Sequence, residues 1–205
     1  RPFYFALLGS HTVLAVVINF LATPGTNWRR LIDSYPLRFA LLSTLYYLAT
    51  CLQGSTQASN LVNWYIHFTE WTAAHAHLAL AASFTTAGMA GILYILPRVT
   101  GREYSRTLAS FVFWTMVIGF PVFFFAFTGA GVTTAVGVNV LNLSVVQLLP
   151  AVEPWRLTRT IAGVFLVAAY LGFALLCLRA GRNGAPRPEE EAQETAPVGT
   201  GAADA

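Results

Sequence analysis

Apolar residues run along the chain in five long, almost uncharged stretches separated by short polar segments. The stretches cover approximately residues 3–22, 35–52, 66–96, 104–131 and 157–178. Each is long enough to cross about 30 Å of hydrocarbon at about 1.5 Å per helical residue. Because lipid offers the backbone no hydrogen-bond partner, each stretch is predicted to be a helix. The pattern therefore predicts an all-α fold, a polytopic transmembrane helix bundle with five spans.

The overall composition excludes an ordinary water-soluble domain. Hydrophobic residues make up 56% of the chain and charged residues only 10%, against roughly 25% charged in an average soluble domain. Five of the nine acidic residues fall within 189–204, so residues 1–180 carry little negative charge. We expect 1–180 to form the membrane bundle. Residues 181–205 are rich in Pro, Gly, Ala and Glu and lack aromatics, which predicts a disordered cytoplasmic tail.

All twelve basic residues are arginine, and most lie at alternate connections between the predicted spans. Three fall near the first connection, three near the third, and three at or after the end of the last span. Basic residues favour the cytoplasmic side of a membrane, so the N-terminus is predicted outside and the C-terminus in the cytoplasm. The net charge of +3 is scattered among these connections, which excludes a nucleic-acid-binding surface.

Two histidines in the third predicted span are the strongest candidates for chemistry. His75 and His77 form a His-Ala-His triplet, and ionisable residues inside a membrane helix are rare and costly. Two positions along a helix correspond to about 200° of rotation and about 3 Å of rise, so the two rings cannot readily share one metal ion. The spacing fits two separate centres, one on each side of the helix, and imidazole is a usual haem ligand. The alternative is two interface histidines bonded to carbonyl groups.

A longer set of residues around the triplet resembles a known family. The residues that carry the resemblance are Leu37-Arg38-Phe39, Gln53-Gly54, Asn63, His67 to Thr72, His75-Ala76-His77 and Leu96-Pro97-Arg98. Together they resemble the catalytic subunit (subunit I) of the haem-copper oxidase superfamily. The resemblance is closest to the C-family cbb-type cytochrome c oxidases and the related nitric oxide reductases. It implies that His75 binds the iron of a high-spin haem and His77 that of a low-spin haem.

Four further residues acquire expected roles from this resemblance. Arg159, and less closely Arg156, would lie at the outer start of the last span and bind haem propionates, for which arginine is a suitable planar donor; an ordinary interfacial arginine is the alternative. His67 would lie one turn from Glu70 near propionates and water, or form a simple interfacial pair with it. Gln53 stands where the cbb-type oxidases have a glutamate, and a glutamine cannot carry a proton by ionising.

The resemblance also implies what the protein does and what it needs. The chain would be the C-terminal part of a respiratory terminal reductase of the bacterial cytoplasmic (inner) membrane, inactive as a fragment alone. Two haems, b-type and one of each spin state, would pass electrons to reduce O2 to water, or NO to N2O in the nitric oxide reductase alternative. Copper or non-haem iron would bind to earlier helices absent from this sequence. Expected partners are those helices, other respiratory subunits, cytochrome c or a similar donor, and lipid. The non-enzyme alternative is a haem-free helical subunit.

Overall fold

The computed structural model describes residues 13–19, 22 and 28–186, with the side chains of Trp28, Arg30 and Asn183 excepted. Most of the first predicted span, and the tail from 187 onward, therefore lie outside the described residues. The elements, in chain order, are α2 (Trp28–Asp33), α3 (Tyr35–Gln57), α4 (Asn60–Ile66), α5 (Glu70–His77), the π-helical turn η2 (Leu78–Phe84), α6 (Thr85–Thr100), β1 (Arg102–Glu103), α7 (Arg106–Asn139), α8 (Val145–Asn183) and β2 (Ala185–Pro186). The fold is all-α, as predicted, apart from the two-residue pairing of β1 with β2.

Three continuous helices among the described residues are long and apolar enough to cross a membrane. They are Glu70–Thr100, Arg106–Asn139 and Val145–Arg182, with mean hydropathies of 1.7, 2.1 and 2.5. The first contains α5, η2 and α6, so the third predicted span is one rod with a π-helical middle. The second predicted span lies on α3, which is not among these three. Its polar residues include Ser43, Thr44, Thr50 and Gln53.

Several predicted boundaries were wrong because local capping overrides the apolar pattern. α8 begins at Val145, well before the predicted start at 157, because Ser144 and Gln147 form a capping box there. α7 likewise continues past 131 to Asn139. α8 also runs beyond 178 to Asn183, and the following Ala185–Pro186 pairs with Arg102–Glu103, so the predicted tail starts with ordered backbone.

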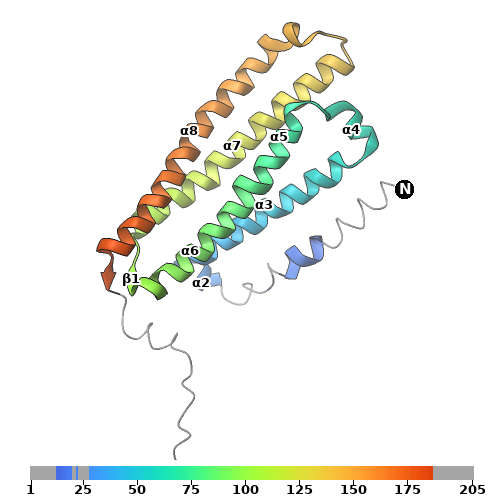
Figure 1. Ribbon diagram of the computed structural model, residues 1–205. Helices are drawn as coiled ribbons and strands as arrows, with labels where there is room; N and C mark the ends of the chain where they lie inside the picture. Colours follow the sequence, from blue (N-terminus) through green and yellow to red (C-terminus); the bar gives the residue numbers. More distant parts are fainter. Residues whose placement is uncertain (1–12, 20–21, 23–27, 187–205) are drawn as a thin grey trace, which may run out of the picture.

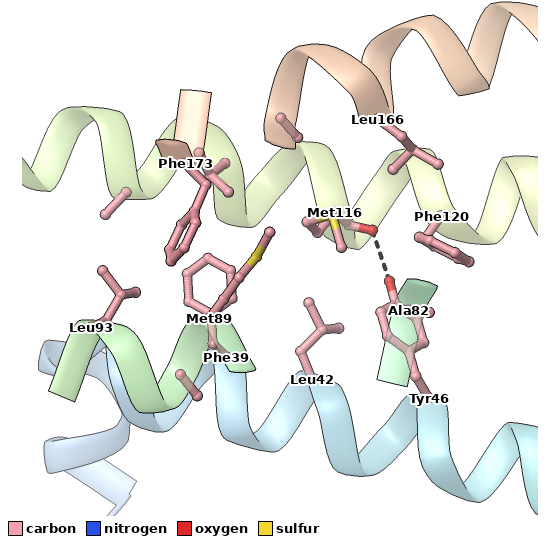
Figure 2. Close-up of a cluster of buried hydrophobic side chains, with 14 of the residues drawn as sticks. Phe39, Leu42, Tyr46, Ala82, Met89, Leu93, Met116, Phe120, Leu166 and Phe173 are labelled. Carbon is pink, nitrogen blue, oxygen red and sulfur yellow. Dashed lines mark hydrogen bonds between the residues drawn. The ribbon is translucent and has the colours of Figure 1, made fainter. Parts of the chain in front are cut away.

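The helices pack as two antiparallel pairs (Figure 1). α7 and α8 form a long hairpin, while α3 lies along η2 and α6, and α5 packs against α7. The shared core gathers side chains from α3, α6, α7 and α8, including Phe39, Met89, Met116 and Phe173 (Figure 2). The Tyr46 hydroxyl donates to the Met116 carbonyl at 2.7 Å and so ties α3 to α7.

A second polar link joins α3 to the π-helical turn. The Ser43 hydroxyl donates to the Ser83 carbonyl at 3.0 Å, and the Ser83 hydroxyl donates to the Ser43 carbonyl at 3.3 Å. Such paired bonds satisfy backbone carbonyls that lipid cannot. They also fix the rotation of α3 relative to the rod that carries the two candidate histidines.

Candidate haem-binding site

The first candidate ligand, His75, projects from α5 toward α3. Its imidazole lies against Gly54, where an added Cβ atom would be 2.9 Å from the His75 Cε1 atom and 3.5 Å from Nε2. A glycine is required at this point of α3, because any side chain would occupy the space of the ring. The half-buried imidazole is therefore held at the interface between the two helices.

The second candidate ligand, His77, projects from α5 toward α7. Its exposed ring stacks on Phe127 with centroids 5.1 Å apart and an interplanar angle of 29°, and Phe123 lies 5.5 Å away. His77 Nδ1 lies 2.8 Å from the Ala73 carbonyl. Because a carbonyl oxygen only accepts, Nδ1 carries the proton and Nε2 keeps its lone pair. This is the tautomer in which a histidine binds a metal through Nε2.

The two rings therefore face different helices, as the spacing of the triplet predicts. A π-helical turn starts immediately after His77, at Leu78. The Thr85 hydroxyl donates to the Leu80 carbonyl, five residues back, in keeping with this wider turn. π-helical turns inside α-helices are rare and occur frequently at functional sites.

Several buried polar atoms of α3 and α5 have no hydrogen-bond partner. The buried atoms that lack a hydrogen bond include His75 Nδ1, both amide atoms of Gln53, Gln57 Oε1 and Trp71 Nε1. Gln53 is only 8% exposed. Buried polar groups in proteins are nearly always satisfied, so these atoms call for a polar ligand or bound water beside them. The last two turns of α3 contain Gln53 and Gln57 together with Gly54, which contacts the His75 ring. The unpartnered polar atoms of α3 therefore lie close to the side of α5 that carries His75.

An acidic residue at the start of α5 binds two arginines of α8. Glu70 accepts from Arg156 Nε at 3.1 Å and from Arg159 Nη1 at 3.0 Å, one arginine on each carboxylate oxygen. The Arg159 guanidinium also lies 4.5 Å from the ring centroid of Phe127. Phe127 therefore contacts both Arg159 and His77.

The arginines stand in a different place from the one predicted. They were expected at the outer start of the last helix, but α8 is already capped at Ser144, so Arg156 and Arg159 lie well inside it. Each guanidinium has five N–H donors, and Glu70 uses only part of this capacity. Arg156 and Arg159 stay 39% and 28% exposed, respectively, so further acceptors can reach them.

His67 does not share a helix with Glu70, contrary to the prediction. It is exposed at the end of α4, with Nδ1 donating to the Asn63 carbonyl at 2.7 Å. Phe68 has a positive φ of 65°, which breaks the helix, and Thr69 then caps the start of α5. The predicted span from 66 therefore begins only at Glu70. The rings of His67 and Phe68 are in tilted contact, with centroids 4.8 Å apart and an interplanar angle of 57°.

Two partners of the candidate site were missed at the sequence level. Glu70 was paired with His67, although a charge within an apolar stretch signals an opposite charge from another helix. Phe127 was treated as one of many aromatics in α7, and only the packing of α7 on α5 singles it out. Among the described residues, no group of three or more His, Cys, Asp or Glu side chains is placed to hold a metal ion.

Comparisons with known proteins place the chain in a family. The Cbb3-type cytochrome c oxidase subunit CcoN1 of Stutzerimonas stutzeri is 26% identical over 188 residues, covering 88% of this chain and 40% of the relative. The cytochrome c oxidase subunit 1 of Rhodobacter capsulatus is 32% identical over 110 residues, covering 52% of this chain and 20% of the relative. The chain thus spans less than half the length of these relatives.

The fold is also shared with a solved structure. A cryo-EM structure of a heme-copper terminal oxidase dimer matches 75% of this chain and 28% of its own chain, with a TM-score of 0.62 at 19% identity. The model of the family described as "Cytochrome C and Quinol oxidase polypeptide I" matches residues 4–165. Since this match covers well over half of the sequence, the chain belongs to the cytochrome c and quinol oxidase polypeptide I family.

Proposed function

We propose that this chain forms the haem-ligating wall of a respiratory haem-copper oxidoreductase, with His75 binding a high-spin haem and His77 a low-spin haem. One observation carries the proposal: the two imidazoles leave one helix toward different neighbours, α3 and α7. The alternative, in which both histidines only hydrogen-bond to carbonyl groups at helix interfaces, does not require the two rings to face different helices. His77 does bond a carbonyl, but through Nδ1, which leaves Nε2 for a metal.

The residues around both histidines support this proposal. On the His75 flank, the glycine at 54 makes room for the ring, the unpartnered amide of Gln53 offers a donor and an acceptor, and Gln57 Oε1 offers a further acceptor. On the His77 flank, Phe123 and Phe127 orient the imidazole and supply an apolar wall. A bound haem would supply an iron that changes oxidation state; the protein fixes its axial ligand and the polarity around it.

Arg156 and Arg159 are proposed to bind the anionic propionates of a haem held by His77. Arg159 lies over the ring of Phe127, and the same ring stacks on the His77 imidazole, so Phe127 contacts both side chains. Glu70 holds both guanidinium groups and neutralises one of their two charges. The net charge of this three-residue cluster is +1, which suits a carboxylate partner. His67, at the end of α4, is proposed as a peripheral polar residue near the same outer side.

Oxygen reduction to water is the proposed reaction, and relatives named as cytochrome c oxidases support it. A specific observation keeps nitric oxide reduction as the second candidate. Gln53 is buried. By the resemblance to the cbb-type oxidases, those proteins carry a glutamate at the corresponding position. The amide of Gln53 cannot ionise, so it can orient water but not carry a proton away by itself. Proton delivery on this flank would then require another route.

The complete enzyme needs more than this chain. The copper or non-haem iron ligands, and a second ligand for the low-spin haem, are proposed to come from further helices of the catalytic subunit. Other respiratory subunits and cytochrome c or a similar donor are the proposed partners. The proposed location is the bacterial inner membrane, with the arginine-rich end of the bundle in the cytoplasm. Figure 1 shows the start of α3, β1 and the end of α8 at this end of the bundle. Arg38 belongs to the first turn of α3, Arg98 to the last turn of α6, Arg102 to β1 and Arg182 to the last turn of α8.

The proposal is tested by replacing His77 with alanine in the intact membrane complex. We expect the sharp low-spin b-type bands of the reduced-minus-oxidised spectrum to disappear while carbon monoxide still binds the high-spin haem. Leu80→Ala, which shortens an exposed side chain about one turn along, is the matched control and should leave both signals unchanged. Unchanged low-spin bands in His77→Ala would refute the assignment and favour a haem-free subunit. Turnover of the wild-type complex with O2 and with NO separates the two reactions.

A further inference from the structure

A groove of about 620 Å³ runs along the outer surface of α7 and is walled by α8 at one end. Its lining is dominated by large exposed side chains, among them Trp114, Ile118 and Phe165, which are 53%, 62% and 59% exposed. The opposite face of α7, which includes Val112 and Met116, is fully buried in the core. The groove therefore opens away from the candidate haem site, toward the surroundings of the bundle.

The length of the groove matches the depth of one membrane leaflet. It extends along α7 from Thr107 to Val122, which is about 22 Å at 1.5 Å per residue. One leaflet of a bilayer with its headgroups is about as deep, 20–22 Å. The lining is almost entirely apolar, so a hydrocarbon chain lying along this groove would contact apolar side chains over its whole length.

A positive charge stands at one end of the groove. Arg106, Ser110, Trp114, Ile118 and Val122 follow one another at intervals of four, so they form a single ridge along α7. The last four line the groove, and Arg106 begins the ridge with an exposed side chain. The described residues record no hydrogen-bond or ion-pair partner for it.

Further arginines lie at the same end of the bundle as Arg106. Arg102 donates to the Arg182 carbonyl, which brings the end of α8 beside the start of α7. Arg179 is exposed one turn earlier on α8. Glu103 on β1 and Asp33 at the end of α2 are the acidic residues that the structure describes at this end of the bundle. Guanidinium groups bind phosphate oxygens well, and a cluster of them at a membrane surface attracts anionic lipid.

We propose that this groove binds an anionic phospholipid, with the phosphate at Arg106 and one acyl chain along the ridge to Val122. The site requires that the bundle lie in a membrane but is independent of the haem assignment. A lipid in this site would be a bound component of the protein, distinct from the bulk lipid of the membrane. The apolar lining of the groove contacts the acyl chain, and the arginines give selectivity for an anionic headgroup.

Lipid labelling in the full chain, purified with its native assembly and placed in nanodiscs, tests the proposal. The nanodiscs hold equal amounts of phosphatidylglycerol and phosphatidylethanolamine, one of them carrying a photoreactive acyl chain. We expect labelled phosphatidylglycerol to modify the segment 107–122 more than the peptide containing Leu171, which is 66% exposed on α8 outside the groove. Arg106→Gln should lower this labelling by about fivefold, the factor that one arginine provides at a membrane surface.

The matched control is Arg98→Gln. Arg98 donates to the Tyr94 carbonyl and lies over the ring of that residue at the end of α6, away from the groove. Its replacement should leave the labelling of 107–122 unchanged. Equal labelling of 107–122 and Leu171 would overturn the proposal, as would equal labelling by the two lipids or equal effects of the two substitutions. Cross-linking of a photoreactive residue at Ile118 to another protein segment, in place of lipid, would also overturn it.

Discussion

A methyl group at Gly54 would reveal whether the His75 imidazole is fixed by a ligand. The added Cβ atom would lie 2.9 Å from His75 Cε1, whereas carbon atoms in good contact are about 3.5–4.0 Å apart. The ring must therefore retreat by about 0.6 Å or more. A free imidazole can rotate away at small cost, but a ring bound to iron cannot move without straining its bond to the metal.

The expected size of the effect follows from comparing the two states. Overpacking a well-packed site costs about 1–3 kcal/mol, and this cost falls mainly on the haem-bound state, where the ring is held. Replacing a helical glycine by alanine also stabilises the helix by up to about 1 kcal/mol. That gain is common to the haem-bound and haem-free chains and cancels in the binding equilibrium. Gly54→Ala should therefore weaken binding of the high-spin haem by about 5- to 150-fold.

The assay is a competition for haem between the purified membrane complex and a haem-scavenging protein, followed in the absorption spectrum. Gly88→Ala is the matched control, because an added Cβ at Gly88 meets no heavy atom within 4 Å. It should retain haem as the wild type does, whereas Gly54→Ala should lose the high-spin haem and keep the low-spin one. Identical haem retention and carbon monoxide spectra in the two variants would refute the assignment of His75 as an axial ligand.

Two further substitutions test what holds the bundle together. Glu70→Gln removes the charge that binds both arginines of α8. Because these side chains are 21–39% exposed, we expect the free energy of unfolding to fall by only about 1–2 kcal/mol. The loss should be seen as a lower thermal unfolding midpoint. Glu103→Gln at the other end of the bundle is its control, and an equal shift in both variants would contradict a specific role for the ion pairs. Tyr46→Phe removes the hydrogen bond to the Met116 carbonyl, which should cost about 1–2 kcal/mol of unfolding free energy. Tyr94→Phe, at a side chain that is 53% exposed, should cost less, and equal losses would show that the bond across the bundle adds nothing.

Features that depend on neighbours along the chain could be predicted from the sequence. The apolar stretches predicted the helices at 35–52, 104–131 and 157–178, because hydrophobic length and the backbone's need for internal hydrogen bonds are local properties. The divergence of His75 and His77 follows from helical rotation alone. The helix ends were harder to place: the capping box at Ser144 and the positive φ of Phe68 override the hydrophobic pattern.

The residues around the candidate site depend on how distant segments pack, and the sequence could not supply this. Helical periodicity predicts on which side of its helix His77 lies. Only the packing of α7 on α5 places the Phe127 ring against the His77 ring. Likewise, Glu70 meets Arg156 and Arg159 across more than eighty positions of chain. The sequence thus determined the membrane helices and the two opposed histidines, since local geometry is enough for both. The tertiary structure decided which glycine, aromatic ring and charges surround them, because the register between helices is set by packing of side chains far apart in the chain.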